Sequence, residues 1–168
     1  MKTYTAYLGI GSNLGDRHKY LQHAVRALSR VAGVRVVWTS SVYETDPVGN
    51  IEQPKFLNAI VEVETSLAPE ALFTDVKRIE REVGRSNHER WAPREIDVDI
   101  LLYDGLVHDS DTLKVPHPEL PNRKFVLVPL REIAPDLVHP ISGLTVTELG
   151  AACCDQSRVV KTAYRLFV

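Results

Sequence analysis

The sequence lacks most features that mark secreted, disulfide-stabilised or membrane-spanning proteins. Its only cysteines, Cys153 and Cys154, are adjacent, and neighbours in sequence make a poor disulfide and an incomplete zinc site. We interpret both as packing residues. No N-terminal leader pattern and no apolar run near 18 residues is visible, so we expect no membrane association. With reduced cysteines, these absences predict a cytoplasmic location.

An excess of charge of either sign is also missing. The 20 Lys and Arg residues against 22 Asp and Glu residues give a net charge of -2, which argues against nucleic acid as a partner. Positive charge is concentrated between residues 77 and 94, which fits a small polyanion better than a duplex. Repeats and linkers are absent, so we expect one globular domain over residues 1–168, without an obligate protein partner.

Motifs for nucleophilic catalysis and for the common phosphate-binding loops are not present. Gly9, Gly11 and Gly15 lie at and just after the end of a predicted strand. Their spacing is not that of a GxGxxG motif, and no Lys-Ser/Thr pair follows them as in a P-loop. We interpret these glycines as a tight turn, with an anion-binding turn as the alternative.

The most informative stretch runs from Arg90 to Gly105 and reads RWAPREIDVDILLYDG. Its second half alternates in the manner of a strand, with Ile96, Val98, Ile100 and Leu102 on one face. Asp97 and Asp99 then share the other face, about 6.6 Å apart along the backbone.

Two carboxylates this close repel each other unless a cation lies between them, and Mg²⁺ combines one or two carboxylates with substrate phosphates. Arg85, Arg90 and Arg94 lie just upstream, and arginine is suited to phosphate oxygens. The stretch therefore predicts phosphoryl-type chemistry on a nucleotide. Taken alone, the two aspartates would be equally typical of the solvated edge of a sheet.

Periodicity over the first 103 residues predicts the order β-α-β-β-α-β. The predicted elements are a strand from Tyr4 to Ile10, a helix between Asp16 and Gly33, a β-rich run from Val34 to Tyr43, a strand from Phe56 to Thr65, a helix between Pro69 and Gly84, and the aspartate strand. This order indicates an α+β, ferredoxin-like fold with both helices on one face of an antiparallel sheet, followed by a C-terminal extension. The other face is left for a ligand and for the extension.

Two polar segments are long enough to be lids or binding loops: Thr45 to Pro54 and Arg85 to Pro93. For the first segment, a plain surface connection is an equally good interpretation. Phe56 and Asn58 share a strand face beside the first loop, where they could stack on and hydrogen-bond a flat heterocycle or simply stabilise a turn. We interpret Trp91 as a mobile clamp rather than a core anchor.

The remaining elements are less regular. We expect Glu80 to form a solvated pair with Arg81, with a ligand or a lid arginine as the alternative partner. His117 lies in an extended segment and is expected to be a hydrogen-bonded loop histidine. Residues 125–130 are ambiguous between helix and strand because of Pro129. A short helix capped by Thr145 through Cys154 and a strand over residues 159–168 complete the prediction.

Several longer segments make the chain resemble the 6-hydroxymethyl-7,8-dihydropterin pyrophosphokinases of folate biosynthesis. These segments are YLGIGSNLGDR at 7–17, SSVYETDPVG at 40–49, QPKFLNA at 53–59, RIEREVGR at 78–85, the stretch at 90–105, LKVPHPEL at 113–120, NRKFVLVPLREIAP at 122–135 and HP at 139–140. The resemblance covers nearly the whole chain in order. It implies transfer of a pyrophosphoryl group from ATP to the hydroxymethyl oxygen of the pterin, with release of AMP.

The resemblance also implies a role for each matching residue. Asp97 and Asp99 would hold two Mg²⁺ ions, and Arg85 and Arg94 would handle phosphates during catalysis. The pterin would be bound by Thr45, Val48, Phe56, Asn58, Trp91 and Phe125. ATP would be bound by Glu80, Arg85, Arg90, Arg94, Ile100, Leu113, Lys114, His117 and Arg123.

The chain departs from some members of the family at a few positions. Phe56 often corresponds to a tyrosine, Asp46 to a proline, and Asn87 to a second basic residue, in a loop that is one residue shorter here. Two other functions share some of these features: a palm-like nucleotidyl transferase, which would need a nucleic-acid track, and a small-molecule sensor, which would bind its ligand without converting ATP to AMP.

Overall fold

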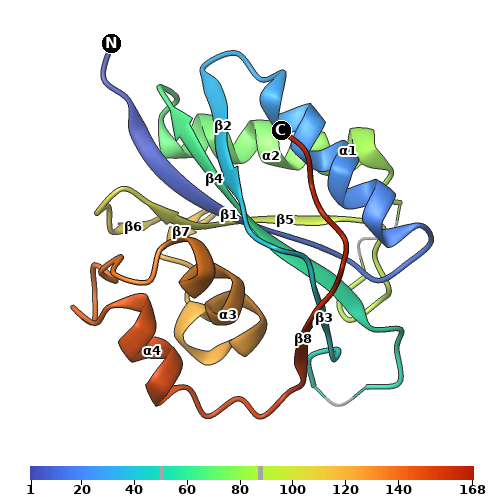
Figure 1. Ribbon diagram of the computed structural model, residues 1–168. Helices are drawn as coiled ribbons and strands as arrows, with labels where there is room; N and C mark the ends of the chain where they lie inside the picture. The colour runs from blue at the N-terminus through green and yellow to red at the C-terminus, as the bar shows by residue number, and fades with distance from the viewer. Residues whose placement is uncertain (50, 87–88) are drawn as a thin grey trace.

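The computed structural model describes residues 1–49, 51–86 and 89–168, and it confirms the α+β, ferredoxin-like architecture (Figure 1). A central antiparallel sheet has the strand order β5-β1-β4-β3-β8, and β2 also pairs with β4. The strands of the sheet are β1 (Tyr4–Ser12), β2 (Val34–Thr39), β3 (Tyr43–Thr45), β4 (Phe56–Thr65), β5 (Asp97–Tyr103) and β8 (Val159–Lys161). A separate hairpin joins β6 (His108–Asp109) to β7 (Lys114–Val115).

The predicted β-rich run from Val34 to Tyr43 forms two strands along one edge of β4. Strand β2 pairs with Val61–Thr65 and β3 pairs with Phe56–Asn58. Ser40 closes the gap between them, because its N–H donates to the Ile60 carbonyl oxygen at 2.9 Å and its hydroxyl oxygen accepts from the Ile60 N–H at 2.8 Å. The edge is interrupted without leaving these buried polar groups unpaired.

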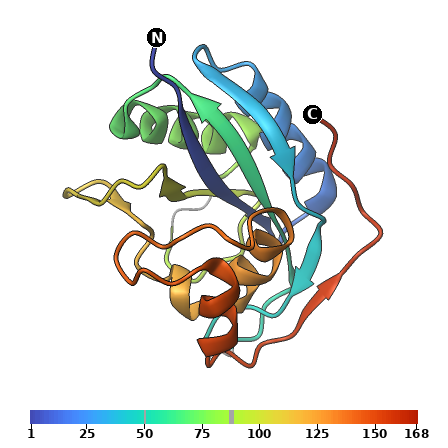
Figure 2. The same cartoon turned by 60° about the vertical axis from the view of Figure 1, so that its left-hand side comes forward.

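Helices α1 (Arg17–Ser29) and α2 (Pro69–Val83) cover one face of the sheet (Figures 1 and 2). The Asp16 carboxylate caps α1 by accepting from the Lys19 N–H at 3.1 Å, and Gly84, with a φ of 130°, ends α2 as predicted. Helix α1 ends at Ser29 rather than at Gly33, which lies in the following turn. Leu21, Val25 and the alternate residues of β4 form the main core between the helices and the sheet.

The tight-turn interpretation of the glycines is correct for Gly15 and wrong for the other two. Gly15 has a φ of 72°, which favours glycine. Gly9 and Gly11 lie inside β1, which extends to Ser12, and they pair with Asp99 and Asp97 of β5. Their side of the strand faces the two aspartates, so the missing side chains leave that face uncovered.

The C-terminal third covers part of the opposite face. A 3-10 turn, η1 (Leu120–Asn122), leads into α3 (Lys124–Ile133), which is helical despite Pro129, and α4 (Val146–Ala152) packs nearby (Figure 2). Thr145 caps α4 with a capping box as expected, although the helix ends at Ala152 rather than Cys154. Cys153 packs against this second core, whereas Cys154 is exposed and is not a packing residue.

Two further predictions are corrected by the sheet. A bulge shifts the register of β1 and β5, so that Tyr7 pairs with Leu102 while Leu8 pairs with Ile100. Leu101 and Leu102 therefore both join the core beneath α3, and the predicted alternation fails after Ile100.

The expected final strand over residues 159–168 is limited to β8. After β8 the chain runs along α1, where the Gln22 side chain bonds both the N–H and the carbonyl oxygen of Phe167. In the described part of the chain, no helix is long and apolar enough to cross a membrane.

Candidate active site

A pocket opens on the face of the sheet that carries the aspartates, between the ends of β1, β4 and β5, the loop after β3, the segment before β5 and the start of α3. It encloses about 150 Å³. Ten of the residues predicted to bind substrate, metal or phosphate line it: Thr45, Val48, Phe56, Asn58, Trp91, Arg94, Asp97, Asp99, Arg123 and Phe125. Residues from four separate stretches of sequence therefore meet in one cavity.

The floor of the pocket is formed by Asp97 and Asp99, which face the same side of β5 as predicted. Val98 and Ile100 point the opposite way, into the main core. Across the sheet, each aspartate lies beside a glycine of β1, so no side chain of β1 covers it. The alternation of β5 and the glycines of β1 together leave both carboxylates available to the cavity.

Asp97 is held by two arginines. Its Oδ2 atom lies 2.8 Å from Arg94 Nη1, and its Oδ1 atom lies 3.2 Å from Arg85 Nη1. Burial raises the pKa of Asp97 above its usual value; the charge of Arg94 opposes this shift, and the charge of Asp99 adds to it. Among the described residues, the Asp99 carboxylate has no hydrogen bond or ion pair, so it is the freer of the two oxygen donors.

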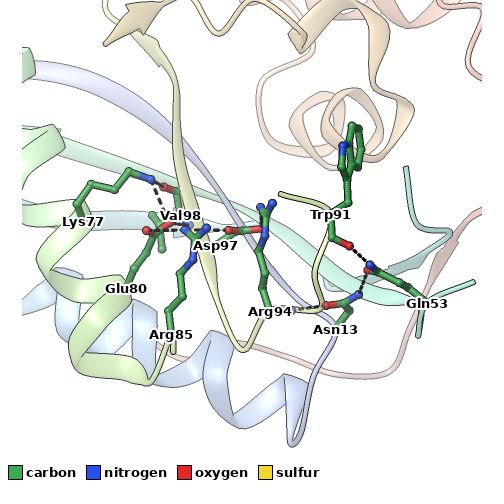
Figure 3. A network of polar contacts seen from close by, with 9 residues as sticks. All are labelled: Asn13, Gln53, Lys77, Glu80, Arg85, Trp91, Arg94, Asp97 and Val98. Carbon is green, nitrogen blue, oxygen red and sulfur yellow. Dashed lines mark hydrogen bonds and ion pairs between the residues drawn. The ribbon is translucent and has the colours of Figure 1, made fainter. Parts of the chain in front are cut away.

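Glu80 connects the helical layer to this floor (Figure 3). Its side chain is only 4% exposed, and it accepts from the Val98 N–H at 2.8 Å, from Arg85 Nη1 at 2.8 Å and from Lys77 Nζ at 3.1 Å. The expected solvated pair with Arg81 is wrong, and the alternative, a pair with a lid arginine, is confirmed. Glu80 fixes both the backbone of β5 between the aspartates and the Arg85 guanidinium.

Four buried side-chain atoms have no hydrogen-bond partner within the described residues. Two of them, the Nε atoms of Arg85 and Arg94, belong to the arginines that hold Asp97, and the others are Ser12 Oγ and Ser157 Oγ. Buried donors of this kind usually find a partner, because leaving one unpaired costs about 1–3 kcal/mol. Two unpaired guanidinium N–H groups beside a carboxylate pair fit an anionic ligand with several oxygens, such as a phosphate chain.

The walls of the pocket suit a flat polar ring. Phe56 and Phe125 contribute aromatic surface from β4 and α3. Asn58 is 9% exposed, and its Nδ2 donates to Thr45 Oγ1 at 2.7 Å, which fixes the carboxamide against the wall. A Cβ atom at Gly11 would lie 2.4 Å from Asn58 Oδ1, so this glycine is required for the position of Asn58.

Trp91 lines the same pocket and is 47% exposed, so the core-anchor alternative is wrong. Its φ of 68° is in the left-handed region, which is unfavourable for a large side chain. Its indole ring points away from Asn13 and Gln53 (Figure 3), and a Cβ atom at Gly49 would lie 3.8 Å from the ring. The geometry is compatible with a clamp, although its mobility stays a prediction.

Asn13 joins the two loops and was not anticipated from the sequence. It is 1% exposed; its Nδ2 donates to Gln53 Oε1 and to the Pro54 carbonyl oxygen, both at 3.1 Å, and its Oδ1 accepts from the Arg94 N–H at 2.8 Å. Gln53 in turn donates to the Trp91 carbonyl oxygen (Figure 3). A buried, fully bonded asparagine two residues after Gly11 therefore links the ring wall to the phosphate side.

Other residues assigned to ATP by resemblance lie outside this pocket. Ile100 and Leu113 are buried in the main core, and the Leu113 N–H and carbonyl oxygen already bond Ser110, whereas Lys114 is exposed. Burial lowers the pKa of His117, and the charge of Asp99 opposes that shift. Arg90 lies beside an adjoining hollow that also contacts Asp46, Trp91 and Arg123. Asn87 lies outside the described residues.

Sequence reasoning also missed several apolar and backbone contributors to the pocket. They are Gly9, Ile10, Gly11, Asp46, Pro47, Ile51, Gln53, Ala59, Ile60, Ala92, Leu101 and Val126. The glycines were visible in the sequence, but only the pairing of β1 with β5 shows that they flank the aspartates. In the described chain, no group of three or more His, Cys, Asp or Glu residues is placed to hold a metal without further ligands.

Comparison with known proteins agrees with this geometry. The family model described as 7,8-dihydro-6-hydroxymethylpterin-pyrophosphokinase (HPPK) matches residues 7–135. The 2-amino-4-hydroxy-6-hydroxymethyldihydropteridine pyrophosphokinase of Haemophilus influenzae is 41% identical over 155 residues, covering 92% of this chain and 96% of that protein. The protein of the same name from Bacillus subtilis is 49% identical over 128 residues, covering 76% of this chain and 77% of that protein.

Solved structures agree at the level of the fold. Wild-type HPPK-DHPS from Plasmodium falciparum, crystallised with STZ-DHP, superposes with a TM-score of 0.72 at 16% identity. The match covers 90% of this chain and 43% of the longer Plasmodium chain. From the family match and the close relatives, the chain belongs to the 7,8-dihydro-6-hydroxymethylpterin-pyrophosphokinase family.

Proposed function

We propose that this chain transfers a pyrophosphoryl group from ATP to the hydroxymethyl oxygen of 6-hydroxymethyl-7,8-dihydropterin, giving the pterin diphosphate and AMP in folate biosynthesis. The observation that carries the proposal is a single pocket in which a carboxylate pair with flanking arginines adjoins an aromatic wall with a fixed carboxamide. A flat pterin and a polyphosphate need these two environments side by side. The family match supports the same reaction.

Asp97 and Asp99 fit a magnesium site. Both are hard oxygen donors on one face, and two carboxylates leave coordination positions for phosphate oxygens and water. When bound, two Mg²⁺ ions would neutralise phosphate charge and lower the pKa of the acceptor hydroxyl. In the chain itself, Arg85 and Arg94 hold Asp97, and their unpaired Nε–H groups are suited to donate to phosphate oxygens.

The remaining roles concern positioning, which together with electrostatic stabilisation provides nearly all catalysis of phosphoryl-type transfer. Phe56 and Phe125 would stack on the pterin, Asn58 and the backbone near Thr45 and Val48 would read its edge, and Trp91 would exclude water above it. For ATP we retain Glu80, Arg90, Ile100, Leu113, Lys114, His117 and Arg123 as contacts. The side chains of Ile100 and Leu113 are buried, so a contact with ATP would need their backbone groups, and at Leu113 it would compete with the bonds to Ser110.

A direct assay tests the proposal. Purified protein is mixed with ATP, Mg²⁺ and 6-hydroxymethyl-7,8-dihydropterin, and the nucleotide products are separated by chromatography. We expect AMP and pterin diphosphate in equal amounts, and a loss of about 10²–10³-fold in kcat for Asp97→Ala and for Asp99→Ala. Asp75→Ala is the matched control, since Asp75 pairs with Arg78 on the surface of α2 and should leave the rate unchanged.

Formation of ADP instead of AMP, or full activity of both aspartate variants, would contradict the proposal. The two alternative functions are tested in the same samples. A nucleotidyl transferase would release pyrophosphate and require an oligonucleotide, and a sensor would leave ATP intact. The cytoplasmic location and the lack of an obligate protein partner stay predictions from the sequence.

A further inference from the structure

The segment between α4 and β8 lies beyond the residues matched by the family model, which ends at residue 135. It runs from residue 153 to residue 158 without regular structure and joins the end of α4 to β8 (Figure 1). Asp155 and Ser157 line the hollow that adjoins the pocket, together with Asp46, Trp91 and Phe125. The segment is therefore placed to influence the pterin side of the site.

Its first contact is with the start of α3. Asp155 Oδ2 accepts from the Lys124 N–H at 3.0 Å, and its Oδ1 accepts from the Ser157 N–H at 2.9 Å. The residue in the N-cap position of α3 is Arg123, whose side chain makes no capping hydrogen bond. Asp155 supplies this cap from a distant part of the chain, next to Phe125, and its charge also suits the N-terminus of a helix.

Its second contact is with the opposite wall. The Arg158 N–H donates to Asp46 Oδ2 at 3.0 Å, and the Asp46 N–H donates to the Arg158 carbonyl oxygen at 3.3 Å. The pairing continues into the sheet, where Val159 of β8 lies opposite Thr45 of β3. Thr45 is the residue whose hydroxyl oxygen accepts from Asn58.

We propose that residues 155–158 are a positioning element for the pterin subsite, which holds the Phe125 wall and the Thr45 wall at a fixed separation. The argument rests on the function proposed above. Asp155 and Asp46 are positioning residues in this scheme, because each fixes the backbone beside a wall residue. If either contact is lost, the pterin must order the wall when it binds, which weakens its affinity.

The test compares Asp155→Ala with Asp155→Asn, whose single amide oxygen can accept from the Lys124 N–H but not also from the Ser157 N–H. Thr145→Ala is the control, because it removes an equivalent N-cap from α4, where Thr145 Oγ1 accepts from the Glu148 N–H at 3.1 Å. We expect Asp155→Ala to raise KM for the pterin about fivefold, with KM for ATP unchanged. Asp155→Asn, which keeps one of the two acceptors, should give a pterin KM between those of the wild type and Asp155→Ala, and Thr145→Ala should leave it unaltered.

Equal effects on both substrates, equal effects of Asp155→Ala and Thr145→Ala, or an unchanged pterin KM would overturn the inference. If Asp155→Ala does not fold, Asp46→Ala tests the second contact, and Asp46→Asn is its conservative partner. The same selective rise in pterin KM with rescue is expected there, and its absence would refute the inference. A wild-type protein that makes no AMP would instead refute the proposed function.

Discussion

Substitution of Glu80 tests the buried connection between α2 and the floor of the pocket. In Glu80→Ala, the Val98 N–H loses its acceptor in the buried interior, and Arg85, whose side chain is 14% exposed, loses its closest carboxylate. Lys77 is 30% exposed and can turn to solvent, so it adds little to the cost. The variant should therefore lose stability mainly through one unpaired buried donor and one undercompensated cation.

The expected loss follows from these two contributions. An unpaired buried N–H costs about 1–3 kcal/mol, and removing one partner of a buried ion pair costs about 3–5 kcal/mol in total. We therefore expect Glu80→Ala to lower the free energy of unfolding by about 4 kcal/mol and Tm by about 10 °C for a chain of this size. Glu80→Gln can still accept from Val98 but loses the charge that faces Arg85, so it should be about 1–3 kcal/mol more stable than Glu80→Ala.

Urea and thermal unfolding followed by circular dichroism provide the measurement. Glu82→Ala is the matched control: Glu82 lies two residues further along α2, and its side chain is 53% exposed and pairs with Arg78. A surface pair of this type contributes about 0–1 kcal/mol. The reasoning fails if Glu80→Ala and Glu82→Ala lose the same stability, or if Glu80→Gln is as destabilised as Glu80→Ala.

Three further outcomes are expected. Gly11→Ala should displace Asn58 and raise KM for the pterin about tenfold. Gly105→Ala is the control, because a Cβ atom there meets no atom within 4 Å, and it should leave this KM unchanged. Equal KM values for the two variants would contradict the close approach of Gly11 to Asn58. Asn13→Ala and Gln53→Ala should each raise KM for both substrates, and the double variant should show less than the sum of their effects, because both remove one bridge. Burial raises the pKa of Glu132, but hydrogen bonds from the Tyr43 hydroxyl and the Ser41 N–H lower it more, so the net pKa lies below its usual value. The ionised carboxylate therefore stabilises the fold above about pH 4.3. This contribution is lost as the pH falls through the folded-state pKa of Glu132. Urea unfolding between pH 3 and pH 6 should show a shallower acid dependence for Glu132→Gln, and an unaltered slope would count against this assignment.

Local patterns were sufficient where the deciding interactions are close in sequence. The alternation in β4 and at the start of β5 predicted which side chains share a face, and it correctly placed Asp97 beside Asp99 and Phe56 beside Asn58. The Asp16 cap of α1, the Gly84 end of α2 and the Thr145 cap of α4 depend on contacts within a few residues. Such contacts can be predicted from the sequence, because backbone geometry fixes the periods of strands and helices.

Tertiary structure decided the features that depend on pairing between distant segments. Glu80 is buried because β5 packs against α2, where the Val98 N–H donates to the Glu80 carboxylate. The residues near Glu80 in the sequence do not indicate that this strand packs there. Gly9 and Gly11 became part of a strand because β1 lies between β4 and β5, and the bulge in that pairing moved Leu102 to the other face. The sequence by itself determined which residues could do the chemistry, whereas the register between strands and the long-range hydrogen bonds of Asn13 and Asp155 decided how those residues are held, because these contacts form only when separate elements pack together.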